Sequence, residues 1–402
     1  MHGTMAQSRV KHYGLLMSIV FIGYLIFGVS ENVKGPALPR MQDDFGIGEW
    51  EIGLLLAFNS IGFLLASSFA GAIVQAVGLR ASLIVTFVCM AVSGWMMGAS
   101  NSFATFAASF FFLYVWNGLL EIALALLSAR IFTKNTGMMM NLSHFFYGLS
   151  STVAPLAATA LMAWSIGGGE PLGWRGMYAI MLALSILPAI PAIVAKFPSE
   201  AGDSGTERTT WRSFAKERAA WYIVVMLAFG VTAELAAAAW LVNFLEKVHD
   251  WDNARAAATL SGFFFCFMLA RLVLGPVTDR LGFVKSIVAF SAFSAVCTIA
   301  AVALGQGAAA VLFALSGAGI APVYPTVMAL LSKRYPRGTD AAITFTVTTI
   351  GILGIAGNFV IGGLTDWLGY RAGFLAIGGC ALGCAAMGAA LYRLLRKQGE
   401  VV

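Results

Sequence analysis

Long apolar stretches separated by short polar ones run through the whole chain. Twelve of them are long enough, at about 20 residues each, to cross a bilayer as an α-helix. We therefore expect an all-α membrane protein with 12 transmembrane helices. The predicted spans are 13–38, 50–77, 80–99, 103–131, 137–165, 174–197, 219–245, 254–281, 283–304, 308–332, 339–366 and 370–394.

Only one polar gap between the spans is long. Residues 198–218 include Ser-Glu-Ala-Gly-Asp-Ser-Gly-Thr-Glu-Arg, which is a linker composition, and divide the chain into six-helix halves at 13–197 and 219–395. Most of the 25 Lys and Arg residues lie on the side of the N-terminus. Because basic loops stay inside, we expect the tails 1–12 and 396–402 and the linker to be cytoplasmic, in an inner (plasma) membrane protein.

The composition supports a membrane protein and excludes several other classes. Of the 402 residues 59% are hydrophobic and 11% are charged, whereas a soluble domain carries about 25% charged residues. The net charge of +6 resides in the loops, so no nucleic-acid partner is predicted. The five Cys residues all fall inside apolar runs, which favours buried small side chains over metal ligands. We expect a monomer with no cofactor, no metal and no enzymatic activity.

Internal repeats relate the two halves. Residues 27–32 (Phe-Gly-Val-Ser-Glu-Asn) resemble 229–234 (Phe-Gly-Val-Thr-Ala-Glu), and Gly71-x3-Gln75 resembles Gly275-x3-Asp279-Arg280-Leu281-Gly282 and Gly362-x3-Asp366. Such a parallel duplication is typical of the major facilitator superfamily, whose signature loop is similar to 275–282. Asp279 and Arg280 are therefore predicted to act in gating. Gln75 replaces the acidic residue in the first copy.

Pro322 and Pro325 must break or kink the helix predicted at 308–332, because proline removes a backbone donor. Two interpretations remain open for the break. It either provides packing and curvature or acts as a hinge for alternating access.

Carboxylates inside the apolar spans are the strongest functional signal, because a charge at the bilayer centre costs about 2.5–3.5 kcal/mol on insertion scales. Glu121 lies in the middle of a long apolar run, and Glu234 lies near the middle of its span. Glu31 is three residues from Lys34, so the two either form a self-neutralised pair or leave Glu31 facing a cavity with Asn32. We interpret Glu121, Glu31 and Glu234 as site residues.

His144 lies at a depth similar to that of Glu121 on the neighbouring span. Two interpretations of His144 stay open: a hydrogen bond to Glu121 that forms a proton-responsive pair, or an ordinary hydrogen-bonded structural histidine. Arg271 lies near the cytoplasmic end of its span, and we interpret it as a gating residue rather than an anion-binding one. Aromatic and amide side chains at cavity depth, with the acidic groups, favour a polyhydroxy solute. These further side chains are Trp116, Asn117, Tyr147, Trp240, Asn243, Tyr324 and Asn358.

Four patches resemble the fucose–galactose–glucose:proton symporter family. They are Leu120-Glu121, 141–149 (Asn-Leu-Ser-His-Phe-Phe-Tyr-Gly-Leu) followed by Pro155, Thr232-Ala233-Glu234 with Trp240-Leu241-Val242-Asn243-Phe244-Leu245, and Ala270-Arg271-Leu272 before the 275–280 loop. Ile122 and the following Ala-Leu depart from the family pattern, as does Gly35 where a fucose-type Asp would fall. The identity of the sugar therefore stays open.

The resemblance implies proton-coupled import of a monosaccharide by alternating access. Glu121 would take the proton, and Glu31, Asn32, Asn141, Glu234, Trp240 and Asn243 would contact the substrate or hold the site. Two other functions remain open. One is proton-driven export of drugs, lipids or other amphiphiles, which the 30 Phe and 17 Met residues permit. The other is a non-transporting sensor or assembly partner.

Overall fold

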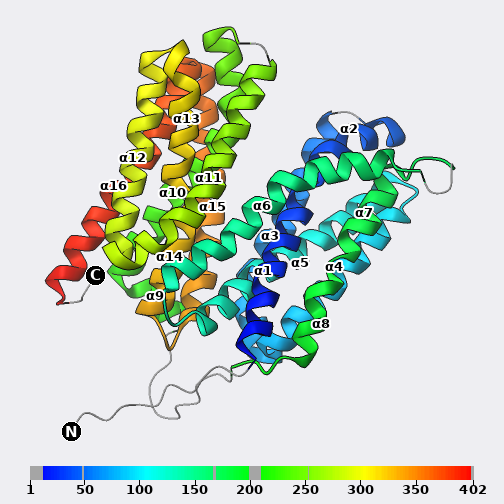
Figure 1. Cartoon of the computed structure of the whole chain (residues 1–402), viewed down its shortest axis with the longest axis horizontal. Helices are drawn as coiled ribbons and strands as arrows, with labels where there is room; N and C mark the ends of the chain where they lie inside the picture. Colours follow the sequence, from blue (N-terminus) through cyan, green and yellow to red (C-terminus); the bar gives the residue numbers. More distant parts are fainter. Residues whose placement is uncertain (1–11, 48, 166–168, 199–209, 252, 400–402) are drawn as a thin grey trace.

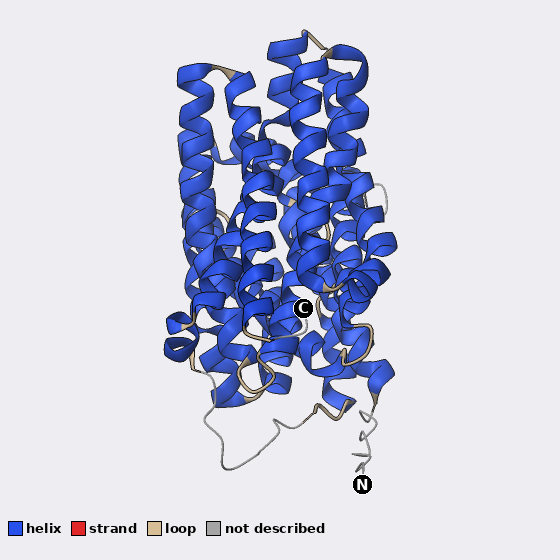
Figure 2. Ribbon diagram, turned by 90° about the vertical axis from the view of Figure 1, so that its left-hand side faces the viewer, coloured by secondary structure: helices blue, strands red, loops and turns tan. Residues whose placement is uncertain are grey.

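The computed structural model describes residues 12–47, 49–165, 169–198, 210–251 and 253–399, and most of them are helical (Figure 1). The first half comprises α1 (Tyr13–Asn32), α2 (Lys34–Phe45), α3 (Glu49–Val77), α4 (Leu79–Gly98), α5 (Phe103–Ile131), α6 (Thr136–Ala163), α7 (Gly173–Ala183) and α8 (Ile186–Val194). The second half comprises α9 (Trp211–Lys216), α10 (Arg218–His249), α11 (Asn253–Leu281), α12 (Phe283–Leu304), α13 (Gln306–Ile320), α14 (Val323–Arg334), α15 (Thr339–Leu368) and α16 (Tyr370–Lys397). Within the described ranges there is no strand (Figure 2), only an isolated bridge between Ser165 and Pro171.

The 12 predicted spans are confirmed. Among the described residues 12 helical segments are long and apolar enough to cross a membrane. Three are interrupted: α1 gives way to α2 at Val33, α7 to α8 at Leu184–Ser185, and α13 to α14 at Ala321–Pro322. The last break was expected from the two prolines, since Pro322 ends one helix and Pro325 is tolerated in the first turn of the next.

The two halves form separate bundles that are inclined to each other (Figure 1). Their ribbons come together towards the end where α1 starts and α9 lies, which we call the linker end, and they diverge towards the opposite end, where α2 and the start of α13 lie. Helices α11, α14 and α15 of the second half pack against α3, α5 and α6 of the first. These six helices therefore carry the contact between the halves.

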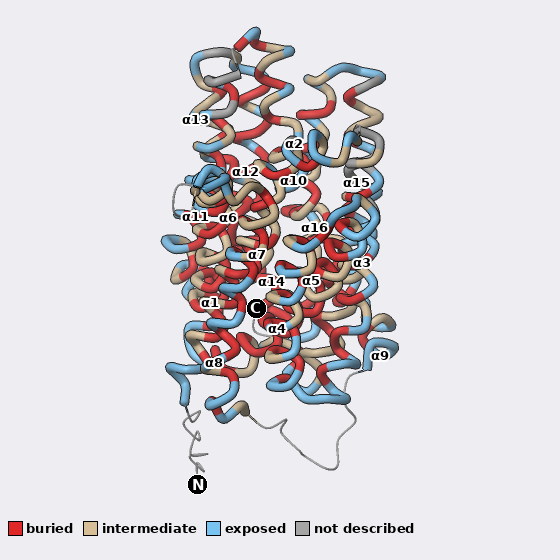
Figure 3. Tube along the Cα trace, turned by 90° about the vertical axis from the view of Figure 1, so that its right-hand side faces the viewer, coloured by how far each residue is buried: buried red, intermediate tan, exposed pale blue. Residues whose placement is uncertain are grey.

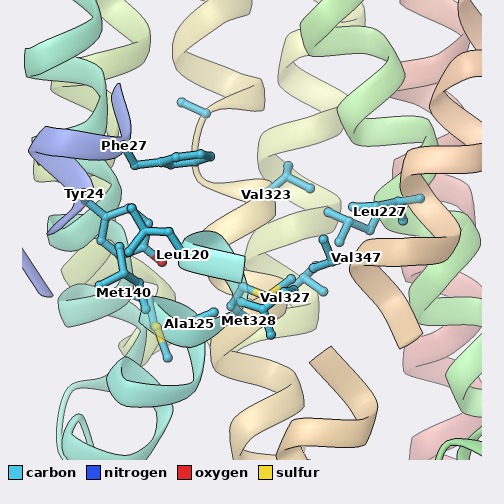
Figure 4. Packing of buried hydrophobic residues seen from close by; sticks show 14 of the residues in the cluster. Tyr24, Phe27, Leu120, Ala125, Met140, Leu227, Val323, Val327, Met328 and Val347 are labelled. Carbon is cyan, nitrogen blue, oxygen red and sulfur yellow. The ribbon is translucent and has the colours of Figure 1, made fainter. Parts of the chain in front are cut away.

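Exposed positions lie on the outside of the bundles, whereas buried residues concentrate between the helices (Figure 3). Large side chains such as Trp367, Leu156 and Leu304 are exposed, which suits a surface that meets lipid rather than water. One buried apolar cluster extends through both halves. Figure 4 shows part of it, with Leu120 on α5 and Val327 on α14 among its members.

The glycine that ends each copy of the predicted repeat, three residues after Gln75, Asp279 or Asp366, has one backbone conformation. Gly78, Gly282 and Gly369 each precede a new helix and have φ values of 84°, 91° and 85°. Residues with side chains rarely adopt this region, so glycine permits the tight turn. The repeat inferred from the sequence is therefore a repeat of structure.

Candidate functional site

Glu121 is hydrogen-bonded across the contact between the halves. Helix α5 carries it to mid-length, and the Tyr324 hydroxyl of α14 donates to its Oε1 atom at 2.6 Å. Tyr324 is the second residue of α14, so the break at Pro322 fixes where its side chain begins. One turn before Glu121, Gly118 lets α5 approach α3, because a Cβ there would overlap the Phe63 carbonyl oxygen. A carboxyl group from one half is thus held by a phenol from the other.

The predicted hydrogen bond between Glu121 and His144 was wrong. In the described structure Glu121 bonds to Tyr324, and the buried Nε2 atom of His144 has no partner. The His144 ring instead lies between two tyrosines, with ring centroids 4.7 Å from Tyr24 and 5.3 Å from Tyr324. Similar depth on neighbouring helices did not determine the direction of the side chains. The partner of Glu121 is the phenol of Tyr324 from the other half, not the imidazole of His144.

Arg271 lies deeper than its predicted place near the end of a span. It is 3% exposed, and it donates from Nε to the Ala321 carbonyl at 3.1 Å and from Nη1 to the His144 carbonyl at 3.2 Å. Ala321 has a free carbonyl because Pro325, four residues on, carries no N–H group. The eight residues between Arg271 and Asp279 correspond to about 12 Å of helix. Arg271 therefore joins the halves at the break between α13 and α14 rather than at the linker end.

Glu31 is the centre of a second polar network, at the junction of α1 and α2. Asn117 Nδ2 donates to its Oε1 atom at 2.9 Å, and the Tyr114 hydroxyl donates to Oε2 at 3.2 Å. Lys34 Nζ lies 3.3 Å from Oε2 and 2.5 Å from the Tyr114 hydroxyl. Ser30 donates to Asn117 at 3.0 Å. Of the two arrangements left open by the sequence, the ion pair of Glu31 with Lys34 is present, and both side chains are partly exposed.

Three other predicted residues lie on α1 and α6. Asn32 donates to Ser151 Oγ at 2.9 Å, and Tyr147 packs against Phe27 with ring centroids 5.3 Å apart. Asn141 is fully buried, donates to the Gly137 carbonyl at 2.9 Å and leaves its Oδ1 atom without a partner.

The predicted residues of α10 and α15 are less closely connected. Glu234 is half-buried and near enough to Arg271 for their charges to interact. Trp240 is half-buried and faces α15 near Gly362, whereas Asn243 is exposed. The side chain of Asn358 lies outside the described residues.

Polar contacts also join the halves at the linker end. Both carboxylate oxygens of Asp279 accept backbone N–H groups of the first turn of α6, from Gly137 at 2.8 Å and Met138 at 2.7 Å. Arg130 on α5 pairs with Asp340 on α15 at 3.1 Å, and Lys333 donates to the Thr133 carbonyl at 2.7 Å. Arg280 is exposed. Asp279 thus caps a helix of the opposite half, where the helix dipole favours a negative charge.

Two tyrosines near the carboxylates were not among the site residues predicted from the sequence. Tyr114 precedes Asn117 and Glu121 by three and seven residues, which places the three on one face of α5. Tyr24 precedes Glu31 by seven residues on α1, and it contacts His144. Helical spacing from each carboxylate would have indicated both residues.

The sequence profile of the Major Facilitator Superfamily matches residues 20–353 and 237–401. The chain belongs to this superfamily. It is therefore a multi-pass membrane protein of a transporter superfamily, which agrees with its 12 apolar helices.

Two relatives cover most of the chain at low identity. The L-fucose-proton symporter of Escherichia coli (strain K12) is 21% identical over 377 residues, which span 86% of this chain and 85% of the relative. An uncharacterized MFS-type transporter of Yersinia pestis is 25% identical over 346 residues, which span 85% of this chain and 86% of the relative.

Solved structures show the same fold. The transporter FucP in the outward conformation superposes with a TM-score of 0.80 at 17% identity, covering 94% of this chain and 99% of that one. The proton:xylose symporter XylE, bound to 6-bromo-6-deoxy-D-glucose, superposes with a TM-score of 0.75 at 13% identity, covering 96% and 95%. The arrangement of six helices plus six is thus that of known transporters.

Proposed function

We propose that this protein is a secondary active transporter that imports a monosaccharide together with a proton. The observation that carries the proposal is the half-buried Glu121, hydrogen-bonded to Tyr324 at the contact between the two halves. A carboxyl group shielded in this way binds and releases a proton without a metal or cofactor. Its place between the halves lets that proton alter how strongly they hold together.

The orientation of the proposed transporter in the membrane follows from the distribution of basic residues. The positive-inside rule assigns the linker end to the cytoplasm, and the contacts of Asp279, Arg130 and Lys333 between the halves lie at that end. The structure then corresponds to a protein closed towards the cytoplasm. Import proceeds when the halves rock about the central site.

The hydrogen bond of Tyr324 supplies the coupling step. With Glu121 ionised, the hydroxyl donates to a carboxylate, and such charge-assisted bonds are roughly twice as strong as neutral ones. A proton on Glu121 removes the charge and weakens the bond between α5 and α14. Proton loading thereby favours separation of the halves at the linker end, which releases proton and solute to the cytoplasm.

The solute class is supported by polar side chains on α1, α6 and α10. Carboxylate, amide and phenol groups at Glu31, Asn32, Glu234 and Tyr147 offer donors and acceptors to hydroxyl groups, while aromatic rings such as Trp240 offer apolar faces. The likeness to a fucose:proton and a xylose:proton symporter points the same way.

The test is uptake into proteoliposomes that contain the purified protein. Radiolabelled L-fucose, D-xylose, D-glucose and D-galactose are each offered with and without an inward proton gradient. Accumulation of at least one sugar above its external concentration, only with the gradient, is the expected result. Gradient-driven movement of amphiphiles with no sugar accumulation would overturn the proposal in favour of the exporter.

A further inference from the structure

Two pairs of helices, α6 with α11 and α3 with α15, meet across the contact between the halves. In the α6–α11 contact, a Cβ atom at Gly275 would lie 3.1 Å from the Met138 Cα atom. In the α3–α15 contact, a Cβ atom at Gly71 would lie 2.6 Å from Thr344 Oγ1 and 3.6 Å from the Asp340 carbonyl oxygen. Gly71 and Gly275 occupy the same place in the internal repeat. The same close approach is therefore built twice, and each half contributes the glycine once.

In the α6–α11 contact, an acidic residue of one half caps a helix of the other. Asp279 lies one turn after Gly275 on the same face of α11. Its carboxylate accepts the backbone N–H groups of Gly137 and Met138 in the first turn of α6. The cap crosses from one half to the other, so it holds the start of α6 against α11.

In the α3–α15 contact, the corresponding residue carries no charge. The two helices run in opposite directions, since Gly351 approaches Leu64 and, nearer the linker end, Thr344 approaches Gly71. Gln75, one turn after Gly71, therefore lies at the level of the first turn of α15. Gln75 is neutral and exposed, so it offers no negative charge to the N–H groups at the start of that helix.

Asp340 supplies a negative charge from within α15 itself. It is the second residue of the helix, where the helix dipole favours a carboxylate, and the N-cap residue Gly338 has no side chain to act as a cap. Asp340 also forms an ion pair at 3.1 Å with Arg130 in the last turn of α5, where the dipole favours a cation. Both side chains are only 18% exposed. The pair therefore ties two helix ends together across the contact between the halves.

We infer that Asp340 replaces, at the α3–α15 contact, the acidic residue that position 75 lacks. The negative charge has moved from the end of α3 to the start of α15, and an ion pair to α5 holds the contact in place of a cap from α3. Asp340 is thus a positioning residue that keeps α15 against the first half. The inference rests on the proposed function in one respect, that this contact breaks when the halves separate at the linker end.

A cysteine in place of Thr344 reports on this contact, because the Thr344 hydroxyl is buried near Gly71 without a hydrogen-bond partner in the described structure. The rate at which a water-soluble maleimide labels this cysteine is measured on purified protein without any solute. The protein without the added cysteine gives the background from its native Cys residues. Asp340→Asn should raise the rate at least about fivefold, because it removes the charge from both the ion pair and the helix start.

Returning the acid to α3 is the decisive comparison. Gln75→Asp, added to Asp340→Asn, should bring the rate back to within about twofold of the protein that carries only the cysteine. Gln75→Asn is the matched control and should restore nothing, because it adds no charge. Gln75→Asp should also fail to restore the α6–α11 contact in Asp279→Asn, measured at a cysteine in place of Met138, because it lies at the other contact.

An unchanged rate in Asp340→Asn, or a raised rate that Gln75→Asp does not lower, would overturn the inference. If Asp340→Asn fails to fold, Asp340→Ala takes its place in every comparison. Labelling requires no transport. A protein that accumulates no sugar would therefore refute the proposed function, while the labelling rates still decide the role of Asp340.

Discussion

At the scale of single residues, the candidate site consists of a few polar side chains that hydrogen-bond to one another in apolar surroundings. Glu121 and Tyr324 form one such pair, and Asn117, Tyr114 and Lys34 arrange themselves around Glu31. A buried polar group that loses its partner costs about 1–3 kcal/mol. Single-atom changes in these pairs should therefore have measurable effects.

Tyr324→Phe removes the hydroxyl that Glu121 accepts and leaves the ring. We expect the free energy of unfolding to fall by about 1–3 kcal/mol, since Glu121 is left without its donor. Tyr178→Phe is the matched control, because the Tyr178 hydroxyl is buried without a partner in the described structure and its removal should cost little. Thermal unfolding of both variants in the same detergent decides the point. An equal loss in the two would contradict the role of the bond.

Asp44, which lies outside the predicted spans, makes a pH-dependent contribution to the stability of the protein. The hydrogen bond from Trp174 Nε1 at 2.8 Å and the nearby Arg175 guanidinium at 2.6 Å hold the pKa of Asp44 below its usual value, although partial burial opposes them. Because the pKa of Asp44 is lower in the folded than in the unfolded protein, its contacts stabilise the fold fully at a pH above the unfolded-state pKa of about 3.9. This stabilisation is lost as the pH falls through the folded-state pKa.

Asp44→Asn should therefore lower thermal stability at neutral pH, by less than about 1 kcal/mol because the group is half exposed. The difference from the wild-type protein should shrink as the pH falls below about 4. Melting temperatures over a pH series measure it, with the exposed neighbour Asp43→Asn as control. A difference that stays constant down to the lowest pH would refute this explanation.

At the scale of helices, α6 is the element on which the most contacts from the other half converge. Its first turn is capped by Asp279 on α11, and the carbonyl of His144, further along it, accepts from Arg271. Its N-cap residue, Asn135, makes no side-chain cap of its own. The end of α6 therefore relies on a residue of the opposite half, which suits a contact that breaks during transport.

Asp279→Asn removes the charge that the two backbone donors of α6 share. We expect a loss of about 1–3 kcal/mol in the contact between halves, which corresponds to a shift of about 5- to 150-fold towards the state open at the linker end. The rate at which a cysteine placed at Met138 reacts with a water-soluble maleimide measures it. Gln75→Asn, at the corresponding and exposed position of α3, should leave the rate unchanged. A rate unaffected by Asp279→Asn would argue against the cap as a gate.

The close approach of α6 to α11 gives another prediction. A Cβ atom at Gly137 would overlap Thr278 Oγ1 and lie 3.0 Å from Phe283, whereas one at Gly148 would lie 3.5 Å from Met268, an ordinary contact. We expect Gly137→Ala to destabilise the protein by about 1–3 kcal/mol and Gly148→Ala to be neutral or slightly stabilising. Thermal unfolding of the two variants side by side is the measurement. Similar melting temperatures would show that α6 can move away freely.

At the scale of the whole molecule, the fold followed from the sequence and the pairing within the site did not. Apolar length determines the spans, proline determines the break at Pro322, and the repeated glycines determine the turns at Gly78 and Gly282. The partners of the buried groups come from distant positions: Tyr324 lies 203 residues after Glu121. Spans that are apolar on every side carry no pattern that orients one helix against another, so the expected partner of Glu121 was wrong.

The protein as a whole brings six helices from two halves into contact, and Glu121 on α5 lies at that contact. In the proposed mechanism this arrangement ties the protonation of Glu121 to the separation of the halves, so that rocking of the halves and proton transfer are one process.

The most direct measurement of this coupling compares wild-type and Glu121→Gln proteins in proteoliposomes, with the sugar that the wild-type protein accumulates. Proton-coupled import predicts that adding sugar makes the external medium more alkaline with the wild-type protein. It also predicts that Glu121→Gln abolishes both this alkalinisation and gradient-driven accumulation while sugar counterflow continues. Sugar-driven alkalinisation and concentrative uptake that persist undiminished in Glu121→Gln would contradict the role of Glu121.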